Sequence, residues 1–324
     1  MRLSLLDRSR TRTGYPDGAA LTHTIERAVS AERLGYHRFW VAEHHAVPGI
    51  ASASPPVLLG ALGARTNSIR IGSGGVMLPH HQPLVVAEQF LMLDALYADR
   101  VDLGVGRTLG FTEPVRRALR RGSDAPDTFE NDIEELRTYL DGTAAVTARP
   151  AAARTVPVFV LATGRGLAVA ARLGLPVVVG GPLLDRPELT DALAAYRKEF
   201  RPSPRAPEPS VTVLTDVLVA DTDADARELA LPEAWAMARS RQTGEFGPLE
   251  PVAVIRAQPW SGQLRERVEA QLAQGAVGSP TTVGRRLVRL AEATGAAEIM
   301  AFSSTYDRAA QAASDAALRE LLHG

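Results

Sequence analysis

Two kinds of apolar pattern alternate along the chain. Short runs of consecutive apolar residues, such as Leu3 to Leu6 and Phe39 to Ala42, precede longer segments in which apolar residues recur every three or four positions. Such runs are typical of strands covered on both faces, and the longer spacing is typical of helices with one buried face. The predicted strands cover residues 3–6, 39–42, 69–78, 101–105, 156–161, 177–179, 211–219 and 298–302. The predicted helices cover residues 21–34, 55–65, 84–96, 127–140, 167–173, 189–200, 223–240, 263–274, 281–294 and 309–322.

Eight strands alternating with helices in one chain of 324 residues predict an α/β fold, the (β/α)8 TIM barrel. A doubly wound sheet usually carries a GxGxxG turn after its first strand, where this chain has Asp7-Arg8-Ser9 instead. We expect a single domain over residues 1–324, with a long insertion between strands 7 and 8 at residues 220–297. The insertion and the connection at 107–126 are the expected places for a lid or specificity loops.

The composition narrows the possible chemistry. The chain has no cysteine, which excludes disulfides, thiolate nucleophiles and cysteine-ligated metals. Its net charge is −1, so the overall charge favours neither nucleic acid nor an anionic membrane as a partner. No apolar stretch approaches the roughly 18 residues of a membrane span, and the N-terminal apolar run is too short for a signal peptide. These features predict a soluble protein of the cytoplasm.

Histidines gather at the ends of two neighbouring predicted strands. Glu43, His44 and His45 directly follow the second strand, and His80 and His81 end the third. In a barrel these strand ends form the face that carries active sites, where imidazoles suit proton transfer near pH 7. The alternatives are a capping or supporting role and a metal site. The metal is the weaker one, because adjacent residues of an extended chain point to opposite sides.

The third predicted strand is unusually rich in glycine. Gly72, Gly74 and Gly75 flank Ser73 and precede Met77 in a segment that otherwise reads as a buried strand. Glycines weaken strands, so their presence suggests that a flat ligand approaches the backbone closely, or that a peptide bond is strained. A kink at a corner of the barrel is the alternative explanation.

Glycine and arginine also meet at the next two strand ends. Gly106 and Arg107 end the fourth strand, where the arginine suits either a phosphate or a surface ion pair. Thr163, Gly164 and Arg165 lie between the fifth strand and its helix. Backbone N–H groups at a helix N-terminus make this turn a plausible phosphate seat, and a flexible turn is the alternative.

With these segments in place, the chain resembles the bacterial luciferase-like family of flavin-dependent monooxygenases. The resemblance covers nearly the whole chain, is most specific in the first 110 residues, and is nearest to the subgroup of polyketide-tailoring (mensacarcin-type) monooxygenases. It implies a possible aromatic polyketide substrate and a place in antibiotic biosynthesis. The matching segments are Leu34 to His45, Ile71 to Pro79, Ala87-Glu88-Gln89, Asp102 to Arg107 and Gly278 to Val283.

The resemblance implies a TIM-barrel enzyme that takes reduced FMN from a separate, transiently bound flavin reductase. In the family the reduced flavin reacts with O2 to form a C4a-hydroperoxide, which hydroxylates or epoxidises a small organic substrate. A cis non-prolyl peptide behind the flavin ring would fall at Ser73-Gly74. The implied catalytic residues are His44 and His45. The residues assigned to the cofactor are Glu43, Ser73, Gly74, Gly75, Met77, Gly106, Arg107, Thr163, Gly164 and Arg165, and no metal is expected.

The chain also departs from luciferase itself. Luciferase has a cysteine where this chain has Gly106, and Glu-Ser where this chain has Thr163-Gly164, so oxidation of long-chain aldehydes with light is not implied. Three other readings stay open: an F420-dependent hydride-transfer enzyme on the same barrel, a non-catalytic flavin-binding protein and a metal-dependent hydrolase. The apolar segment from Leu84 to Leu96 corresponds to the family's dimer interface, so a homodimer is expected. A fully packed core of a monomer is the alternative explanation of the same pattern.

Overall fold

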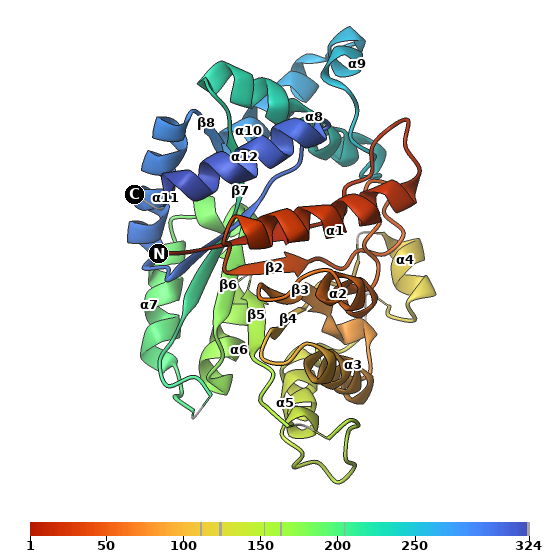
Figure 1. Ribbon diagram of the computed structural model, residues 1–324, viewed down its shortest axis with the longest axis vertical. Coiled ribbons are helices and arrows are strands. Elements are labelled where there is room, and N and C mark those ends of the chain that lie inside the picture. Colours follow the sequence, from red (N-terminus) through yellow and green to blue (C-terminus); the bar gives the residue numbers. More distant parts are fainter. Residues whose placement is uncertain (111, 123–124, 152, 163, 204, 323–324) are drawn as a thin grey trace.

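Eight parallel strands close into a barrel in the computed structural model (Figure 1), which describes residues 1–110, 112–122, 125–151, 153–162, 164–203 and 205–322. Strands β1 to β7 pair in sequence order, and β9 closes the ring between β7 and β1. The predicted (β/α)8 barrel is therefore confirmed. The barrel strands are β1 (Arg2–Asp7), β2 (Arg38–Val41), β3 (Arg70–Met77), β4 (Val101–Gly106), β5 (Val158–Ala162), β6 (Val177–Gly180), β7 (Val211–Val219) and β9 (Glu298–Phe302).

Helices surround the barrel, and most lie where the apolar spacing predicts them. Two short helices, α4 (Glu113–Ala118) and α9 (Val252–Ala257), are not predicted, because six residues are too few to show a helical period. In the described residues no helix is long and apolar enough to cross a membrane. The helices that the apolar spacing predicts are α1 (Asp17–Arg33), α2 (Pro55–Gly63), α3 (Pro83–Leu96), α5 (Phe129–Leu140), α6 (Arg165–Leu173), α7 (Leu189–Glu199), α8 (Asp223–Thr243), α10 (Gly262–Gln274), α11 (Pro280–Thr294) and α12 (Arg308–Leu321). Two 3₁₀ turns lie at Leu78–His80 and Gly181–Asp185.

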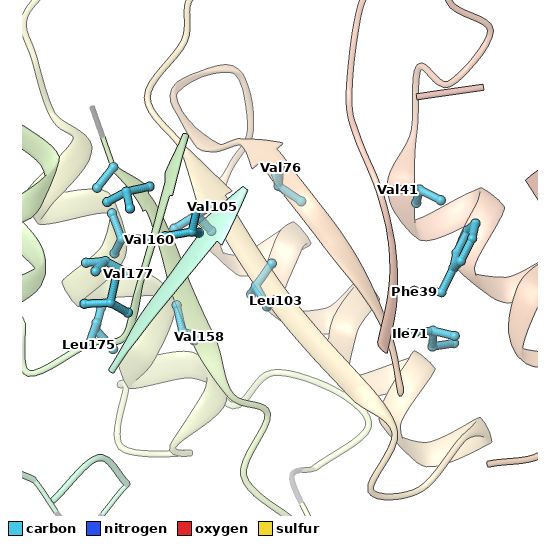
Figure 2. Close-up of a cluster of buried hydrophobic side chains, with 14 of the residues drawn as sticks. Phe39, Val41, Ile71, Val76, Leu103, Val105, Val158, Val160, Leu175 and Val177 are labelled. Atoms are coloured by element: carbon cyan, nitrogen blue, oxygen red, sulfur yellow. The ribbon is translucent and has the colours of Figure 1, made fainter. Parts of the chain in front are cut away.

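The strands are buried on both faces, which is why they read as continuous apolar runs. Their outer faces supply branched side chains to a large core beneath the helices, and Figure 2 shows members of it on neighbouring strands, such as Val41, Leu103 and Val160. Their inner faces supply a smaller cluster inside the barrel, which includes Trp40 and Met300. Because alternate residues face inward, the register decides which side chains reach the mouth.

The insertion between the seventh and last barrel strands is present, and it contains a strand that the sequence does not predict. β8 (Ala276–Gly278) pairs with Val217–Val219, the part of β7 that extends beyond the segment paired with β9. Three residues are too few to show an alternating pattern, and this strand forms only because β7 offers it a free edge. The insertion also carries α8, α9, α10 and α11.

The expected cis peptide at Ser73-Gly74 is wrong by one position. The cis bond joins Gly74 and Gly75. Ser73 still belongs to the regular ladder, because it pairs with Leu103, and its hydroxyl donates to the Gly104 carbonyl at 2.8 Å. The irregular part of β3 therefore begins after Ser73, and the register with β4 shifts between Ser73 and Val76.

Candidate active site

A cavity of about 630 Å³ lies at the carboxyl ends of the strands. Most of the residues that the sequence assigns to a site line this cavity, although they come from three different strand ends. Barrel closure brings the strand ends together, as expected for this fold. The predicted residues that line the cavity are Glu43, His44, His45, Gly74, Gly75, Met77, Gly106 and Arg107.

One wall of the cavity is built from backbone. A Cβ added at Gly75 would lie 2.8 Å from the Gly104 carbonyl oxygen, and one added at Gly104 would lie 2.2 Å from the Ser73 oxygen, so β3 and β4 touch closely there. At Gly106 a Cβ would meet only Val76, at 3.9 Å. Gly75 and Gly104 thus allow β3 and β4 to pack closely, whereas Gly106 leaves open space at the mouth of the barrel.

Glu43 holds the histidines of two strand ends together. Its Oε1 accepts hydrogen bonds from the Nε2 atoms of His45 and His81, each at 2.6 Å, and its Oε2 accepts from the backbone N–H of Met77 at 2.9 Å. Burial alone would raise the pKa of Glu43, but the hydrogen bond and charge of His81, with the bonds from Met77 and His45, lower it. The ionised carboxylate fixes the end of β2 against the end of β3.

The same three side chains have the donor types of a metal site. One ligand atom each from Glu43, His45 and His81 lies within 4.8 Å of the other two. In the structure, however, both imidazoles bond directly to the same carboxylate oxygen. His45 and His81 come from different histidine pairs, so each pair contributes one imidazole to this group.

His44 faces the cavity as a neutral imidazole. Burial lowers its pKa to about 3, and the positive charges of Arg8 and Arg10 contribute to the shift. At neutral pH the ring therefore carries no charge. Its backbone N–H donates to the Ser52 carbonyl at 2.9 Å, which anchors the loop that follows β2.

Three of the four remaining predicted site residues do not line the cavity. Ser73 is fully buried and its hydroxyl joins β3 to β4. Gly164 caps the N-terminus of α6 with φ +56°, and Arg165 begins that helix, but Gly166 is the residue that reaches the cavity. Thr163 lies outside the described residues.

Arg107 stands at the cavity rim and also makes the ion pair that the sequence leaves as its alternative role. Its Nη2 lies 3.2 Å from a carboxylate oxygen of Asp127, and both side chains are about half exposed. An exposed pair of this kind contributes little stability, so the guanidinium remains available to an anion in the cavity. The rim position and the ion pair are therefore compatible.

Sequence reasoning misses the apolar part of the wall and a charged cluster beside it. The apolar side chains come from inward positions of β5, β6 and β7 and from the last residue of β5, where nothing distinguishes them in sequence from other strand residues. They are Leu161, Ala162, Val178 and Leu214. The charged cluster consists of Arg8, Arg10 and Glu233, which are far apart in the chain and meet only through the fold.

Comparisons with known proteins identify the family of the chain. The family model "Luciferase-like monooxygenase" matches residues 1–298. The chain is 38% identical over 314 residues to a luciferase-like monooxygenase of Escherichia coli (strain K12), covering 95% of this chain and 93% of the relative. It is 42% identical over 187 residues to an N-acetyl-S-alkylcysteine monooxygenase of Bacillus subtilis (strain 168), covering 55% of this chain and 56% of the relative.

Solved structures show the same fold. The crystal structure of apo-MsnO8 superposes with a TM-score of 0.89 at 34% identity and covers 99% of this chain and 98% of the other. Two distant structures share the fold alone: an FMN complex of a 3,6-diketocamphane monooxygenase component from Pseudomonas putida (19% identity, TM-score 0.73, 99% and 97% covered) and an F420-dependent secondary alcohol dehydrogenase (16%, 0.68, 99% and 97%). The chain belongs to the luciferase-like monooxygenase family.

Proposed function

We propose that the protein is a monooxygenase that uses reduced FMN and O2 to hydroxylate or epoxidise a small organic substrate. The observation that carries the proposal is the cavity at the mouth, which has a backbone wall at β3 and β4, an apolar floor and a neutral histidine. When bound, reduced FMN supplies the electrons that activate O2. The protein's part is to bind, orient and shield the reacting groups.

The residues of the mouth fit a flavin. The backbone at Gly74 and Gly75 borders the cavity without side chains, which suits a flat ring. Arg107 stands at the rim, and the N-terminus of α6 reaches the cavity at Gly166, so positive charge and free N–H groups are available to a phosphate. We therefore assign the ring to the β3 wall and the phosphate to the region of Arg107 and α6.

Within this arrangement His44 serves proton transfer to or from the reacting group. It lines the cavity as a neutral imidazole, which is a weak base at this low pKa but keeps a ring N–H that it can donate to the reacting group. Glu43 acts through its neighbours, because its two oxygens fix His45, His81 and the β3 backbone. His45 also lines the cavity, and its Nε2–H is engaged by Glu43, which sets its tautomer.

The second candidate is an F420-dependent hydride-transfer enzyme. The same fold serves F420-dependent proteins, and the features described above, a flat wall and an anion seat, suit either cofactor. A flavin-binding protein without turnover is a third possibility. The three differ in ligand and in oxygen use, so one set of measurements separates them.

The test is a titration of the purified protein with reduced FMN, oxidised FMN and F420, followed by oxygen consumption with a flavin reductase present. We expect reduced FMN to bind in a 1:1 ratio and oxygen uptake to rise with substrate. N-acetyl-S-alkylcysteines, named for the relative from Bacillus subtilis, are the first compounds to try. Preferred binding of F420 without oxygen uptake would reject the monooxygenase, and FMN binding without any turnover would support the non-catalytic alternative.

We also propose that two chains associate through α2 and α3, and that the reductase docks only transiently. Val57 on α2 and Val85, Met92 and Leu96 on α3 are large apolar side chains with exposed fractions between 47% and 76%. The two helices contact each other, and large exposed apolar side chains on adjoining helices are typical of an interface. Light scattering should give the mass of a dimer, and Leu96→Asp should give a monomer. A wild-type monomer at micromolar concentration contradicts the proposal.

A further inference from the structure

The wall opposite the glycines carries a charged cluster that the flavin assignment does not use. In the closed ring β1 lies opposite β5, and β9 lies opposite β4. Arg8 follows β1, Asp216 lies on β7, and Phe302 ends β9, directly beside Asp216 in the strand register. The flavin site on β3 to β5 and this cluster therefore occupy different sides of one mouth.

Arg8 is held in place by one salt bridge and one aromatic face. Its Nη2 donates to Glu233 Oε1 at 2.6 Å, and its guanidinium carbon lies 4.6 Å from the centre of the Phe302 ring. The side chain is only 14% exposed. Its Nε–H is buried and meets no acceptor in the part of the chain that the structure describes. A buried N–H of a cation without an acceptor is costly, and a ligand oxygen would remove that cost.

The charges around Arg8 do not balance. Glu233 is shared with Arg10, whose Nε donates to its other oxygen at 2.8 Å. Burial raises the pKa of Asp216 to about 7, against the opposing effect of Arg8, so this carboxyl compensates the second positive charge only in part at neutral pH. His44 is neutral. Two arginines thus face one fully ionised carboxylate, and the cluster keeps an excess of positive charge.

The cluster adjoins the cavity and is covered by the insertion. Phe302 and Leu214 pack in the same cluster inside the barrel, and Leu214 lines the cavity. Glu233 comes from α8, and the ring of Phe246, from the segment after α8, lies 4.1 Å from the Arg10 guanidinium carbon and 5.9 Å from that of Arg8. The long insertion, which is expected to carry specificity, therefore supplies the Glu233 carboxylate of this cluster and the Phe246 ring that covers it.

We propose that Arg8 binds an anionic oxygen of the substrate, as in a carboxylate, so that the substrate is an organic anion with an apolar body. This assignment rests on the proposed function, because it places the substrate between the β3 wall and the β1–β9 side. The apolar body lies against Leu214 and its neighbours, and the anion meets the guanidinium of Arg8, whose side chain is 14% exposed. Arg8 is then a substrate-binding residue, and Glu233 and Phe302 are positioning residues.

The test compares hexanoate with hexanamide, which has the same chain without the charge, by ligand-observed NMR at pH 6.5. The wild-type protein should bind hexanoate more tightly. Arg8→Gln should weaken hexanoate binding by about 10- to 100-fold, as expected for a lost hydrogen bond to a charged group, and leave hexanamide binding unchanged. Arg117→Gln, the matched change in the exposed ion pair on α4, should leave hexanoate binding unchanged. Equal binding of the two probes, or a loss in Arg107→Gln rather than Arg8→Gln, overturns the proposal.

A second variant guards against a misfolded Arg8→Gln protein. Asp216 faces Arg8 and Glu233, and these are the charged groups that act on it. Hexanoate binding should weaken in the wild type as the pH rises through about 7, because the ionised Asp216 repels the probe. Asp216→Asn should bind hexanoate more tightly than the wild type at pH 8 and equally at pH 6, and no difference at pH 8 contradicts the proposal. FMN titration of the same samples reports separately on the proposed function.

Discussion

At the N-terminal end of the barrel four charged side chains balance one another, whereas at the mouth two arginines share one fully ionised carboxylate. At the N-terminal end Arg38 bridges Asp102 at 2.7 Å and Glu298 at 2.9 Å, and Arg70 also binds Asp102. Two positive and two negative charges from β2, β3, β4 and β9 thus meet inside the barrel. Asp102 is fully buried and also accepts the Trp40 indole N–H at 3.1 Å.

The difference shows what each end does. At the N-terminal end each of the four charged side chains has an oppositely charged partner, so the cluster ties β2, β3, β4 and β9 together. At the mouth the Nε–H of Arg8 is buried without an acceptor in the described residues, and Asp216 has a raised pKa. Balanced buried charges are typical of structure, and unbalanced ones in a cleft are typical of binding or catalysis.

The largest effect is expected from breaking the balanced end. Asp102→Asn removes the shared partner of Arg38 and Arg70 and leaves buried positive charge uncompensated. We expect a loss of about 3–5 kcal/mol in the free energy of unfolding, measured by urea denaturation at pH 7.5. Glu113→Gln, which breaks the exposed pair with Arg117 on α4, should change it by less than about 0.5 kcal/mol. Similar losses in both variants would contradict this account of the N-terminal end.

At the mouth the main effect should fall on turnover. His44→Ala removes the group assigned to proton transfer, and we expect substrate oxidation to slow by about 10²-fold or more. Binding of reduced FMN should stay nearly intact, because the ring and phosphate are assigned to other residues. His37→Ala is the control, since His37 lies at the start of β2 beside Arg38, at the opposite end of the barrel. Unchanged turnover in His44→Ala would reject the role of His44.

Two glycines of the same strand sharpen the contrast between structure and site. In Gly104→Ala the new Cβ would lie 2.2 Å from the Ser73 backbone oxygen, so we expect a loss of roughly 1–3 kcal/mol in the free energy of unfolding. In Gly106→Ala the methyl group meets no atom closer than 3.9 Å and faces the cavity. That variant should keep its stability and bind FMN more weakly, as measured by fluorescence titration. Equal stability of the two variants would contradict the close contact of β3 and β4.

Much of the architecture follows from sequence patterns because the strands are buried on both faces. Continuous apolar runs such as Phe39 to Ala42 mark the barrel strands, and polar residues directly after them mark the mouth. The sequence pattern does not predict β8, because its three residues form a strand only by pairing with the free edge of β7. The predicted position of the cis bond is wrong by one residue. The hydrogen bond from the Ser73 hydroxyl to the Gly104 carbonyl, which keeps Ser73 in the ladder, is a tertiary contact that the sequence does not reveal.

The candidate site is only partly predictable for a similar reason. His44, Gly74 and Arg107 stand out because histidine, glycine and arginine are unusual at strand ends. Arg8 and Glu233 are 225 residues apart, and neither lies in a motif, so their salt bridge becomes visible only in the folded chain. Leu161 and Leu214 line the cavity because of their register, which the apolar run alone does not reveal.

The smallest effect concerns the second inward-facing aspartate, Asp216, which should respond oppositely to Asp102. This residue is only partly buried, so solvent screening reduces the effect of its raised pKa on stability. Burial, with Glu233 adding to it, raises the pKa of Asp216 to about 7 in the folded protein, while an aspartate in the unfolded chain ionises near pH 4. Between these values the unfolded chain releases the proton first, so this group makes the folded state less stable as the pH rises from about 4 to 7. Asp216→Asn should therefore match the wild-type stability at pH 4 and exceed it slightly at pH 8, in urea denaturation at both pH values. A loss of stability at pH 8, as expected for Asp102→Asn, would show that Asp216 is a paired structural charge and that the two ends of the barrel do not differ in this way.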